Sequence, residues 1–443
     1  MTVTTAERAH PETRFTPDLP HRARLILVLG LMIALGPLTI DTYLPALPSI
    51  SADLLATSTA VQLTLTGSLI GLGLGQLVIG PISDAVGRRQ PLIAGVAVHI
   101  VASVLCALAP NVVVLGVLRL LQGAGAAAAV VVVMAMVRDV ATGNAAATLL
   151  SRLMLVLGAA PVLAPTLGSE LLRFTQWRGI FVTLALLGVV LLVLALVALP
   201  ETLPLEQRRS DGVGGTFRAY RSLLRDRVFV GLVLVAGLSM GALFCYVAGS
   251  PFVYQEEFGL SEQQFGIAFG VGSVALIAST QLNAVLLRRF RSDQILPVAL
   301  LAGTLNALVL LGVALTGTGG VIALMLPIWG VLGAAGLAFP NAPALALSRH
   351  GDSAGAAAAM LGAVQFGLGA LTPPLVGLLG MDAVAMATGV VVSMVLALAV
   401  LMFVVQPRTS LAARLPQGEP VAELTLTPVR AEGAGEREPC LGC

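Results

Sequence analysis

Residues 66–89 read TGSLIGLGLGQLVIGPISDAVGRR, and this stretch decides how the rest of the chain can fold. Gly67, Gly71 and Gly75 recur every fourth residue, so on a helix they share one face and let a second helix approach at backbone distance. The apolar run then ends at a short charged turn, Ser83 to Arg89, before a new apolar run begins. The pattern predicts a packing seam that leads into a joint between two membrane-spanning helices.

The composition indicates a protein of the lipid bilayer. Of the 443 residues, 57% are hydrophobic and 11% are charged, whereas soluble domains carry about 25% charged residues. The mean hydropathy is +0.95, and the net charge of +2 is too small to indicate a nucleic-acid partner. The spans hold neither a phosphate-binding glycine loop nor a cluster of nucleophile, base or metal ligands. We therefore expect a protein that is not an enzyme and uses no metal or cofactor.

Apolar stretches of bilayer-spanning length, about 20 residues, occur twelve times between Ala23 and Val405. We expect an all-α membrane protein of twelve transmembrane helices in two pseudo-symmetric six-helix bundles. The joint after the second span has a degraded counterpart after the eighth, NAVLLRRFR at 283–291, and repeated halves place a binding site at their interface. The predicted segments are an N-terminal tail (1–22), a first bundle (23–199), a central loop (200–227), a second bundle (228–405) and a disordered tail (406–443).

Arginines in the short loops predict the orientation. Most of them, including Arg88, Arg89, Arg288 and Arg289, fall on one side of the predicted spans. By the positive-inside rule this side is cytoplasmic, and it carries both termini and the central loop. The last four residues, CLGC, are interpreted as part of the disordered tail, because a lone CxxC without further ligands is a weak metal, redox or lipidation signal.

Ionisable residues inside predicted spans are rare, and each is therefore a candidate functional residue. Asp41 lies in the first span, in the run TIDTYLPALP at 39–48. Apolar surroundings favour the neutral form of a carboxyl group, so Asp41 could take up a proton at one membrane face and release it at the other. The alternative is that Asp41 lies at the membrane interface and only caps the helix.

Arg119 is the second candidate, and it shares a face of the fourth span with Gln122. It would lie about 12 Å from the outer end of its helix, a depth that makes an ion pair with Asp41 possible. The alternative is a fixed structural counter-ion. Packing is likewise the alternative role for the residues that could line a substrate cavity, which are Tyr43, Gln122, Tyr246, Gln365 and Phe366.

The segment GPISDAVGRR resembles the loop between the second and third helices of the major facilitator superfamily. The resemblance implies a twelve-helix transporter with a conformational latch on its cytoplasmic side. The residues that match the family pattern are Gly80, Asp84, Gly87, Arg88 and Arg89.

Further motifs resemble the Bcr/CflA group of multidrug exporters. They include the run from Asp41 to Pro48, RLLQGAG from Arg119, and the fifth span with Pro161, Pro165 and Gly168. The resemblance implies that Asp41 binds protons and drug, that Arg119 takes part in coupling, and that the fifth span is an antiporter helix. It also implies a bacterial cytoplasmic membrane as the location.

The expected function is proton-coupled efflux of small apolar or cationic drugs, such as chloramphenicol-like or bicyclomycin-like antibiotics, by alternating access. The expected partners are the drug, protons and the bilayer, with the protein acting as a monomer. The alternative is a proton-coupled symporter or exporter of a small metabolite, because one fold serves many functions.

Overall fold

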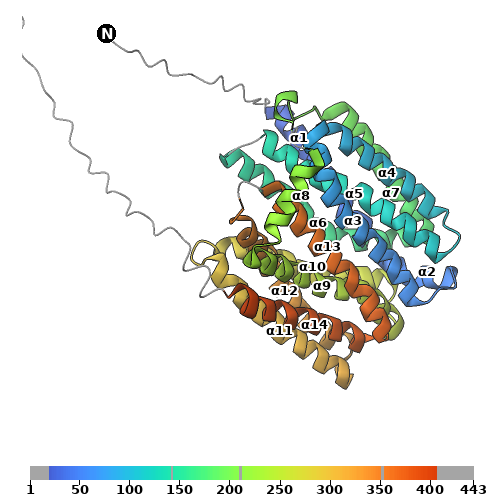
Figure 1. The fold of residues 1–443 in the computed structure, drawn as a ribbon. Helices are drawn as coiled ribbons and strands as arrows, with labels where there is room; N and C mark the ends of the chain where they lie inside the picture. Colours follow the sequence, from blue (N-terminus) through green and yellow to red (C-terminus); the bar gives the residue numbers. More distant parts are fainter. Residues whose placement is uncertain (1–18, 141–142, 209–211, 351–353, 407–443) are drawn as a thin grey trace, which may run out of the picture.

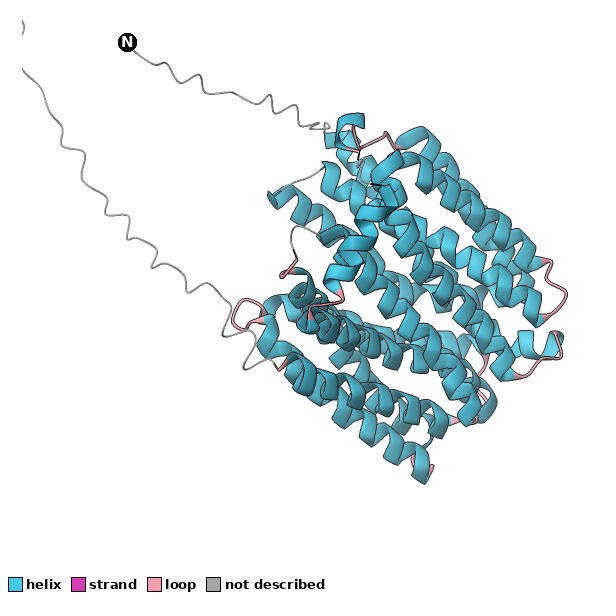
Figure 2. Ribbon diagram, in the orientation of Figure 1, coloured by secondary structure: helices cyan, strands magenta, loops and turns pink. Residues whose placement is uncertain are grey.

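The computed structural model describes residues 19–140, 143–208, 212–350 and 354–406. Helices and short loops make up these ranges, and Figure 2 shows no strand in them, which confirms the predicted all-α class. The N-terminal half contains α1 (Leu19–Asp41), η1 (Leu44–Ala46), α2 (Leu47–Asp53), α3 (Ser58–Val86), α4 (Arg89–Ala107), α5 (Val112–Val140), α6 (Gly143–Leu172) and α7 (Trp177–Ala198). The chain continues through η2 (Leu205–Gln207) and α8 (Gly212–Leu223) into the C-terminal half. That half contains α9 (Arg227–Phe252), η3 (Val253–Glu257), α10 (Glu262–Leu286), α11 (Ser292–Thr316), α12 (Gly320–Leu347), α13 (Ala354–Leu379), α14 (Ala383–Val400) and η5 (Leu401–Val405).

Eleven helical stretches of the described chain are long and apolar enough to cross a membrane. The first runs from Ile26 to Asp53 over 28 residues and joins α1, η1 and α2. The predicted fifth span corresponds to α6, a 30-residue helix that is not one of the eleven. Figure 1 shows α6 among the other long helices, with α1–α7 gathered on one side of the molecule and α9–α14 on the other.

The glycine seam joins α3 to α5 as the sequence predicts. A Cβ atom added to Gly67 would lie 2.5 Å from the carbonyl oxygen of Gly116, and one added to Gly71 would overlap the carbonyl oxygen of Leu120. On its other side α5 meets α4 equally closely, because a Cβ atom on Gly125 would lie 2.6 Å from a backbone oxygen of α4. Small residues therefore hold α5 between two helices at backbone distance.

Buried apolar side chains form three clusters, and the way these clusters draw on the two halves of the chain differs between the two ends of the bundle. We call these the Asp53 end, where Asp53, Trp177 and Asp382 lie, and the Arg88 end, where Arg88 and Asp226 lie. At the Asp53 end one cluster draws on both halves of the chain. At the Arg88 end the N-terminal half and the C-terminal half each have a separate cluster. Among the described residues, the two halves thus share a buried apolar cluster only at the Asp53 end.

Hydrogen bonds between the halves follow the same division. Two of them join η3 to η1, from Gln255 Nε2 to Pro45 O (3.2 Å), and α10 to α6, from Gln263 Nε2 to Ser169 O (3.4 Å). Three more are donated from α3 to carbonyl oxygens of α9 and α13 near the Asp53 end, and none of these carbonyls lies in the Arg88-end clusters. The bonds are Gln62 Nε2 to Ala248 O (3.0 Å), Thr66 Oγ1 to Ala370 O (3.0 Å) and Thr59 Oγ1 to Gly377 O (3.1 Å). At the Arg88 end α8 lies across the two halves: Leu223 is buried in the C-terminal cluster, and the Tyr220 hydroxyl donates to Leu77 O of α3 at 3.4 Å.

The seam generates a stability prediction. Gly71→Ala places its methyl group against the backbone of α5, which cannot move aside as a flexible side chain can, so the free energy of unfolding should fall by roughly 1–3 kcal/mol. Gly312→Ala on α11 is the matched control, because an added Cβ there meets no atom within 4 Å. Thermal unfolding of the purified protein in detergent would compare them. Equal melting temperatures for the two variants would contradict the seam.

Candidate functional site

Asp41 ends α1 at a break in the first membrane span. The chain turns at Thr42 and Tyr43 and resumes as η1, where Pro45 has no N–H to continue the α-helical hydrogen bonds. Asp41 therefore lies near the middle of the 28-residue span rather than at its end. Its side chain is only 7% exposed, and no hydrogen bond or ion pair joins it to another described residue.

Arg119 of α5 is fully buried beside this break. Its Nη1 atom donates to Thr39 O of α1 at 3.0 Å and to Gln122 Oε1 at 2.6 Å. The guanidinium carbon lies 4.5 Å from the centre of the Tyr43 ring and 5.7 Å from that of Phe181, within cation–π range. Its Nε and Nη2 atoms have no partner among the described residues. The guanidinium is thus held by neutral groups.

The structure does not bring Arg119 and Asp41 together as an ion pair. Among the described residues, the acid and the base are both buried, and neither has an oppositely charged partner. An unpaired charge is costly in a membrane interior, and such residues usually mark a binding or proton pathway. The ion pair between Asp41 and Arg119 that the sequence allowed is therefore not formed.

Gln122 and Tyr43 lie in the core of the N-terminal half. Gln122 Nε2 donates to Ser103 Oγ at 2.7 Å, and the Tyr43 hydroxyl lies 2.7 Å from Thr64 Oγ1. Both side chains are 0% exposed, and they surround Arg119. Ser103 was missed by the sequence reasoning, although Ser103 and His99 occur one helical turn apart in an otherwise apolar span, which is a detectable signal.

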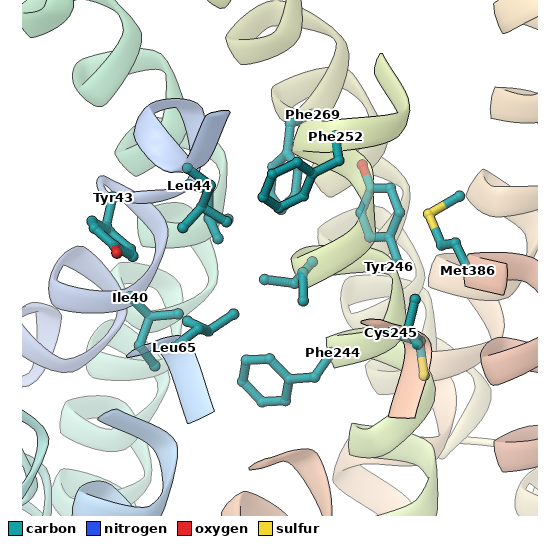
Figure 3. Close-up of a cluster of buried hydrophobic side chains, with 14 of the residues drawn as sticks. Ile40, Tyr43, Leu44, Leu65, Phe244, Cys245, Tyr246, Phe252, Phe269 and Met386 are labelled. Carbon is teal, nitrogen blue, oxygen red and sulfur yellow. The ribbon is translucent and has the colours of Figure 1, made fainter. Parts of the chain in front are cut away.

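Of the predicted cavity residues of the C-terminal half, Tyr246 packs within its own half, beside residues of α11, α12 and α14, whereas Phe366 faces Gly73 of α3. Tyr246 is 3% exposed and stacks on Phe269, with ring centres 5.2 Å apart. Gln365 and Phe366 are both half-buried. The ring centre of Phe366 lies 6.4 Å from that of Phe244. Figure 3 shows Phe244 pointing toward Ile40 and Leu65 of the other half, in an apolar layer that shares residues with the cluster at the Asp53 end.

A cavity of about 330 Å³ opens between the halves at the Arg88 end. Its walls combine apolar side chains with a few polar groups, a composition typical of small-molecule sites. The walls come from α3, α5, α8, α12 and α13, and the polar or charged residues among them are Gln76, Ser83, Asp84, Arg138 and Tyr220. Gly36 of α1 faces the wall residue Val130, since an added Cβ would lie 3.3 Å from its side chain. Asp41 is five residues further along α1, about 7.5 Å of helix rise beyond the wall.

The joint between α3 and α4 is built around Arg88. Its side chain donates to Asp84, to Ser83 Oγ at 2.9 Å and to Asp139 Oδ2 at 2.8 Å. Gly87 has φ +105°, and a Cβ there would lie 2.5 Å from Glu201 Oε2, so the turn requires glycine. Asp84 pairs within its own half and also lines the cavity, as does Gly80.

Glu201 completes the joint from the segment after α7. Its carboxylate accepts the backbone N–H groups of Arg88 at 2.8 Å, Arg89 at 3.1 Å and Leu203 at 3.0 Å. Burial acts to raise the pKa of Glu201, but these N–H donors, together with Arg208, hold the pKa below its ordinary value. Arg89 also donates to Leu196 O of α7 at 2.6 Å. The sequence reasoning missed the role of Glu201, because it lies more than 110 residues from Arg88 and Arg89.

The predicted antiporter helix α6 lies between the two halves. An added Cβ on Gly168 would overlap the carbonyl oxygen of Thr42 and lie 3.1 Å from the Pro45 ring, so α6 meets the broken segment of the first span. Toward the other half, a Cβ on Gly266 of α10 would lie 3.3 Å from Pro165 O. The side chain of Pro161 lies outside the described part of the chain. Among the described residues, no three His, Cys, Asp or Glu side chains come together as metal ligands.

The chain is similar in sequence to a known family of transporters and to several drug-resistance proteins. The profile of the Major Facilitator Superfamily matches residues 29–373. The uncharacterized MFS-type transporter YdgK of Bacillus subtilis is 38% identical over 364 residues, which cover 82% of this chain and 90% of that protein. A bicyclomycin resistance protein homolog of Haemophilus influenzae is 31% identical over 369 residues, covering 81% of this chain and 90% of that protein. The multidrug resistance protein MdtL of Escherichia coli is 32% identical over 243 residues, covering 55% of this chain and 61% of that protein.

Solved structures share the fold at lower sequence identity. The xylose transporter XylE from E. coli, in a partially occluded inward open conformation, matches with a TM-score of 0.69 at 15% identity, covering 86% of this chain and 97% of that chain. A D-xylose-proton symporter matches with a TM-score of 0.67 at 16% identity, covering 85% of this chain and 97% of that chain. Likeness at these identities concerns the fold alone. Together with the helical architecture and the joint, the profile match and the relatives show that this chain belongs to the Major Facilitator Superfamily, and that its relatives include resistance proteins of the bicyclomycin type.

Proposed function

We propose that this protein exports small apolar or cationic drugs across the bacterial cytoplasmic membrane in exchange for protons. The observation that carries the proposal is the Asp41 carboxyl group, buried near the middle of a membrane span without a charged partner among the described residues. Such a group can bind a proton or a cationic or polar drug group, but it does not accommodate both at once. Competition for one carboxyl group is sufficient to exchange the two ligands.

The packing of the two halves supports alternating access. The shared apolar cluster closes the Asp53 end, while separate clusters flank a cavity at the Arg88 end. The arginine-rich loops support a cytoplasmic location of the Arg88 end, with both termini on that side. In this proposal the described state receives drug from the cytoplasm or the inner leaflet. The opposite state would separate the halves at the Asp53 end and close the Arg88 end.

The nature of the cavity supports a small substrate of low charge. A volume of about 330 Å³ lies at the lower end of the range for small-molecule sites, about 300–1,000 Å³. Alanine, valine, methionine and leucine make up half of the residues in the wall, with Gln76 and Tyr220 available for hydrogen bonds. The names of the bicyclomycin and multidrug resistance relatives agree with this substrate class. Both halves of the pathway belong to one chain, so a monomer is sufficient.

Replacing Asp41 gives the sharpest test of the proposal. Inverted membrane vesicles with an acidic interior would be exposed to a panel of apolar antibiotics, and discharge of the pH gradient would be followed. We expect drug-dependent discharge with the wild type and background discharge with Asp41→Asn, because the amide cannot exchange a proton. Asp53→Asn is the matched control, since Asp53 pairs with Arg178 at the bundle end.

Discharge by Asp41→Asn at the wild-type rate would place proton coupling on another residue. No discharge with any compound, together with proton-linked uptake in right-side-out vesicles, would replace the exporter with the symporter alternative.

The joint generates a separate prediction about turnover. The two Glu201 oxygens accept hydrogen bonds from the backbone N–H groups of Arg88 and Arg89. In Glu201→Gln an amide NH2 group replaces one of these oxygens and faces an N–H group, so one hydrogen bond is lost and the turn is held less firmly. We expect transport to slow several-fold while the dissociation constant for drug stays unchanged. Glu170→Gln is the control, because Glu170 forms an exposed pair with Arg173. Weaker drug binding at an unchanged turnover rate would contradict a role of the joint in switching.

A further inference from the structure

The cavity between the halves ends where α3 and α13 come together. A Cβ atom added to Gly73 of α3 would lie 3.3 Å from Ala363 O of α13. Three residues further along α3, toward the Arg88 end, Gln76 is the first residue of this helix that lines the cavity. The charged wall residue Asp84 lies at the opposite end of the α3 wall, where it pairs with Arg88. The inner end of this wall is therefore uncharged, and its polar residue is Gln76.

Gln76 is a buried polar side chain that has no partner among the described residues. It is 8% exposed, and no hydrogen bond joins its amide to another described group. The other buried or half-buried polar residues of the wall, Ser83, Asp84 and Tyr220, each have a partner. A side-chain amide can donate two hydrogen bonds and accept two, and buried polar groups are as a rule paired. The unused capacity of Gln76 therefore requires an explanation.

A glycine of the opposite half leaves room for the Gln76 amide. A Cβ atom added to Gly362 of α13 would overlap Gln76 Oε1 and lie 3.3 Å from Gln76 Nε2. The amide thus reaches from α3 to the other half at a position where α13 has no side chain. Filling this space is one possible role of Gln76. However, an apolar side chain of the same length would fill it without leaving buried donors and acceptors unpaired.

We propose that Gln76 binds the transported compound, and that this compound carries hydrogen-bond donors and acceptors close together, as an amide with hydroxyl groups does. The Gln76 amide has a donor end and an acceptor end, so a partner of the same dual character satisfies both. Such pairing needs no charge on the compound, which suits the uncharged inner end of the wall. The inference rests on the proposed function, because it takes the cavity as the substrate site.

Equilibrium dialysis of the purified full-length protein tests this proposal with two probes. Chloramphenicol carries an amide and two hydroxyl groups, whereas tetraphenylphosphonium is a cation without hydrogen-bonding groups. Gln76→Met keeps the length of the side chain and removes its donors and acceptors. We expect this variant to bind chloramphenicol about tenfold more weakly, because hydrogen bonds to the compound are lost. Its dissociation constant for tetraphenylphosphonium should not change.

Thermal unfolding of the protein without ligand separates recognition from packing. An unpaired buried amide destabilises the folded state, so Gln76→Met should unfold at the same temperature as the wild type or at a higher one. A residue that served only to fasten the two halves would give the opposite result. Its replacement would lower the melting temperature and leave the binding of chloramphenicol unchanged.

Gly362→Ala is a second variant, and it leaves Gln76 in the chain. The added methyl group would take the space of the amide and displace it, so the binding of chloramphenicol should weaken as in Gln76→Met. In a Gln76→Ala background Gly362→Ala should have no additional effect, since no amide remains to be displaced. Gly367→Ala on the same helix is the matched control, because an added Cβ there meets no atom within 4 Å.

Three results would overturn the proposal. They are a wild type that does not bind chloramphenicol, a folded Gln76→Met that binds it as the wild type does, and an equal loss of affinity for both probes. Dialysis requires no pH gradient. A failure of drug-dependent discharge in vesicles would therefore contradict proton exchange and leave recognition by Gln76 standing, and the reverse holds as well.

Discussion

The close approach of α5 to α3 and α4 is the constraint on which the rest of the structure depends. Because glycines remove the side chains between these helices, α5 occupies the middle of the N-terminal half with its backbone against both neighbours. Arg119 and Gln122 consequently lie fully buried between the break of the first span and the polar pair His99 and Ser103 of α4. The Arg119 guanidinium donates to a backbone oxygen and an amide oxygen, and the buried Asp41 carboxyl group is left unpaired among the described residues.

The distribution of apolar clusters explains how such a structure can change state. A single core shared by both halves would hold them in one arrangement, whereas here the halves share a core only at the Asp53 end. The N-terminal and C-terminal clusters of the Arg88 end are complete without each other. Each half can therefore rotate as a unit about the central apolar layer while its own packing persists. The joint of Arg88, Asp139 and Glu201 lies entirely within one half, so it can move with that half.

Much of the fold could be predicted from the sequence, because bilayer-spanning length and close helix approach leave direct patterns. The seam from Gly67 to Gly75 and the joint at Gly87 are examples, since only glycine satisfies the geometry found there. Pairing over long sequence separations could not be predicted. Glu201 binds the joint from more than 110 residues away, and the Gln122 amide donates to Ser103 of another helix. Depth along a helix also does not fix the direction of a side chain, which is why the sequence allowed an ion pair between Asp41 and Arg119 that the structure does not form.

The central claim is that protonation of Asp41 decides which end of the transporter opens, and spin-label distances across the Arg88 end test it most directly. Exposed Ala85 and Arg289, each replaced by cysteine, offer one labelling position in each half of a variant whose four native cysteines are replaced by serine. The account predicts that acidification lengthens this distance in the wild type, and that Asp41→Asn, which mimics the neutral acid, keeps it long at every pH. A distance that ignores pH in the wild type, or that still responds to pH in Asp41→Asn, would contradict it.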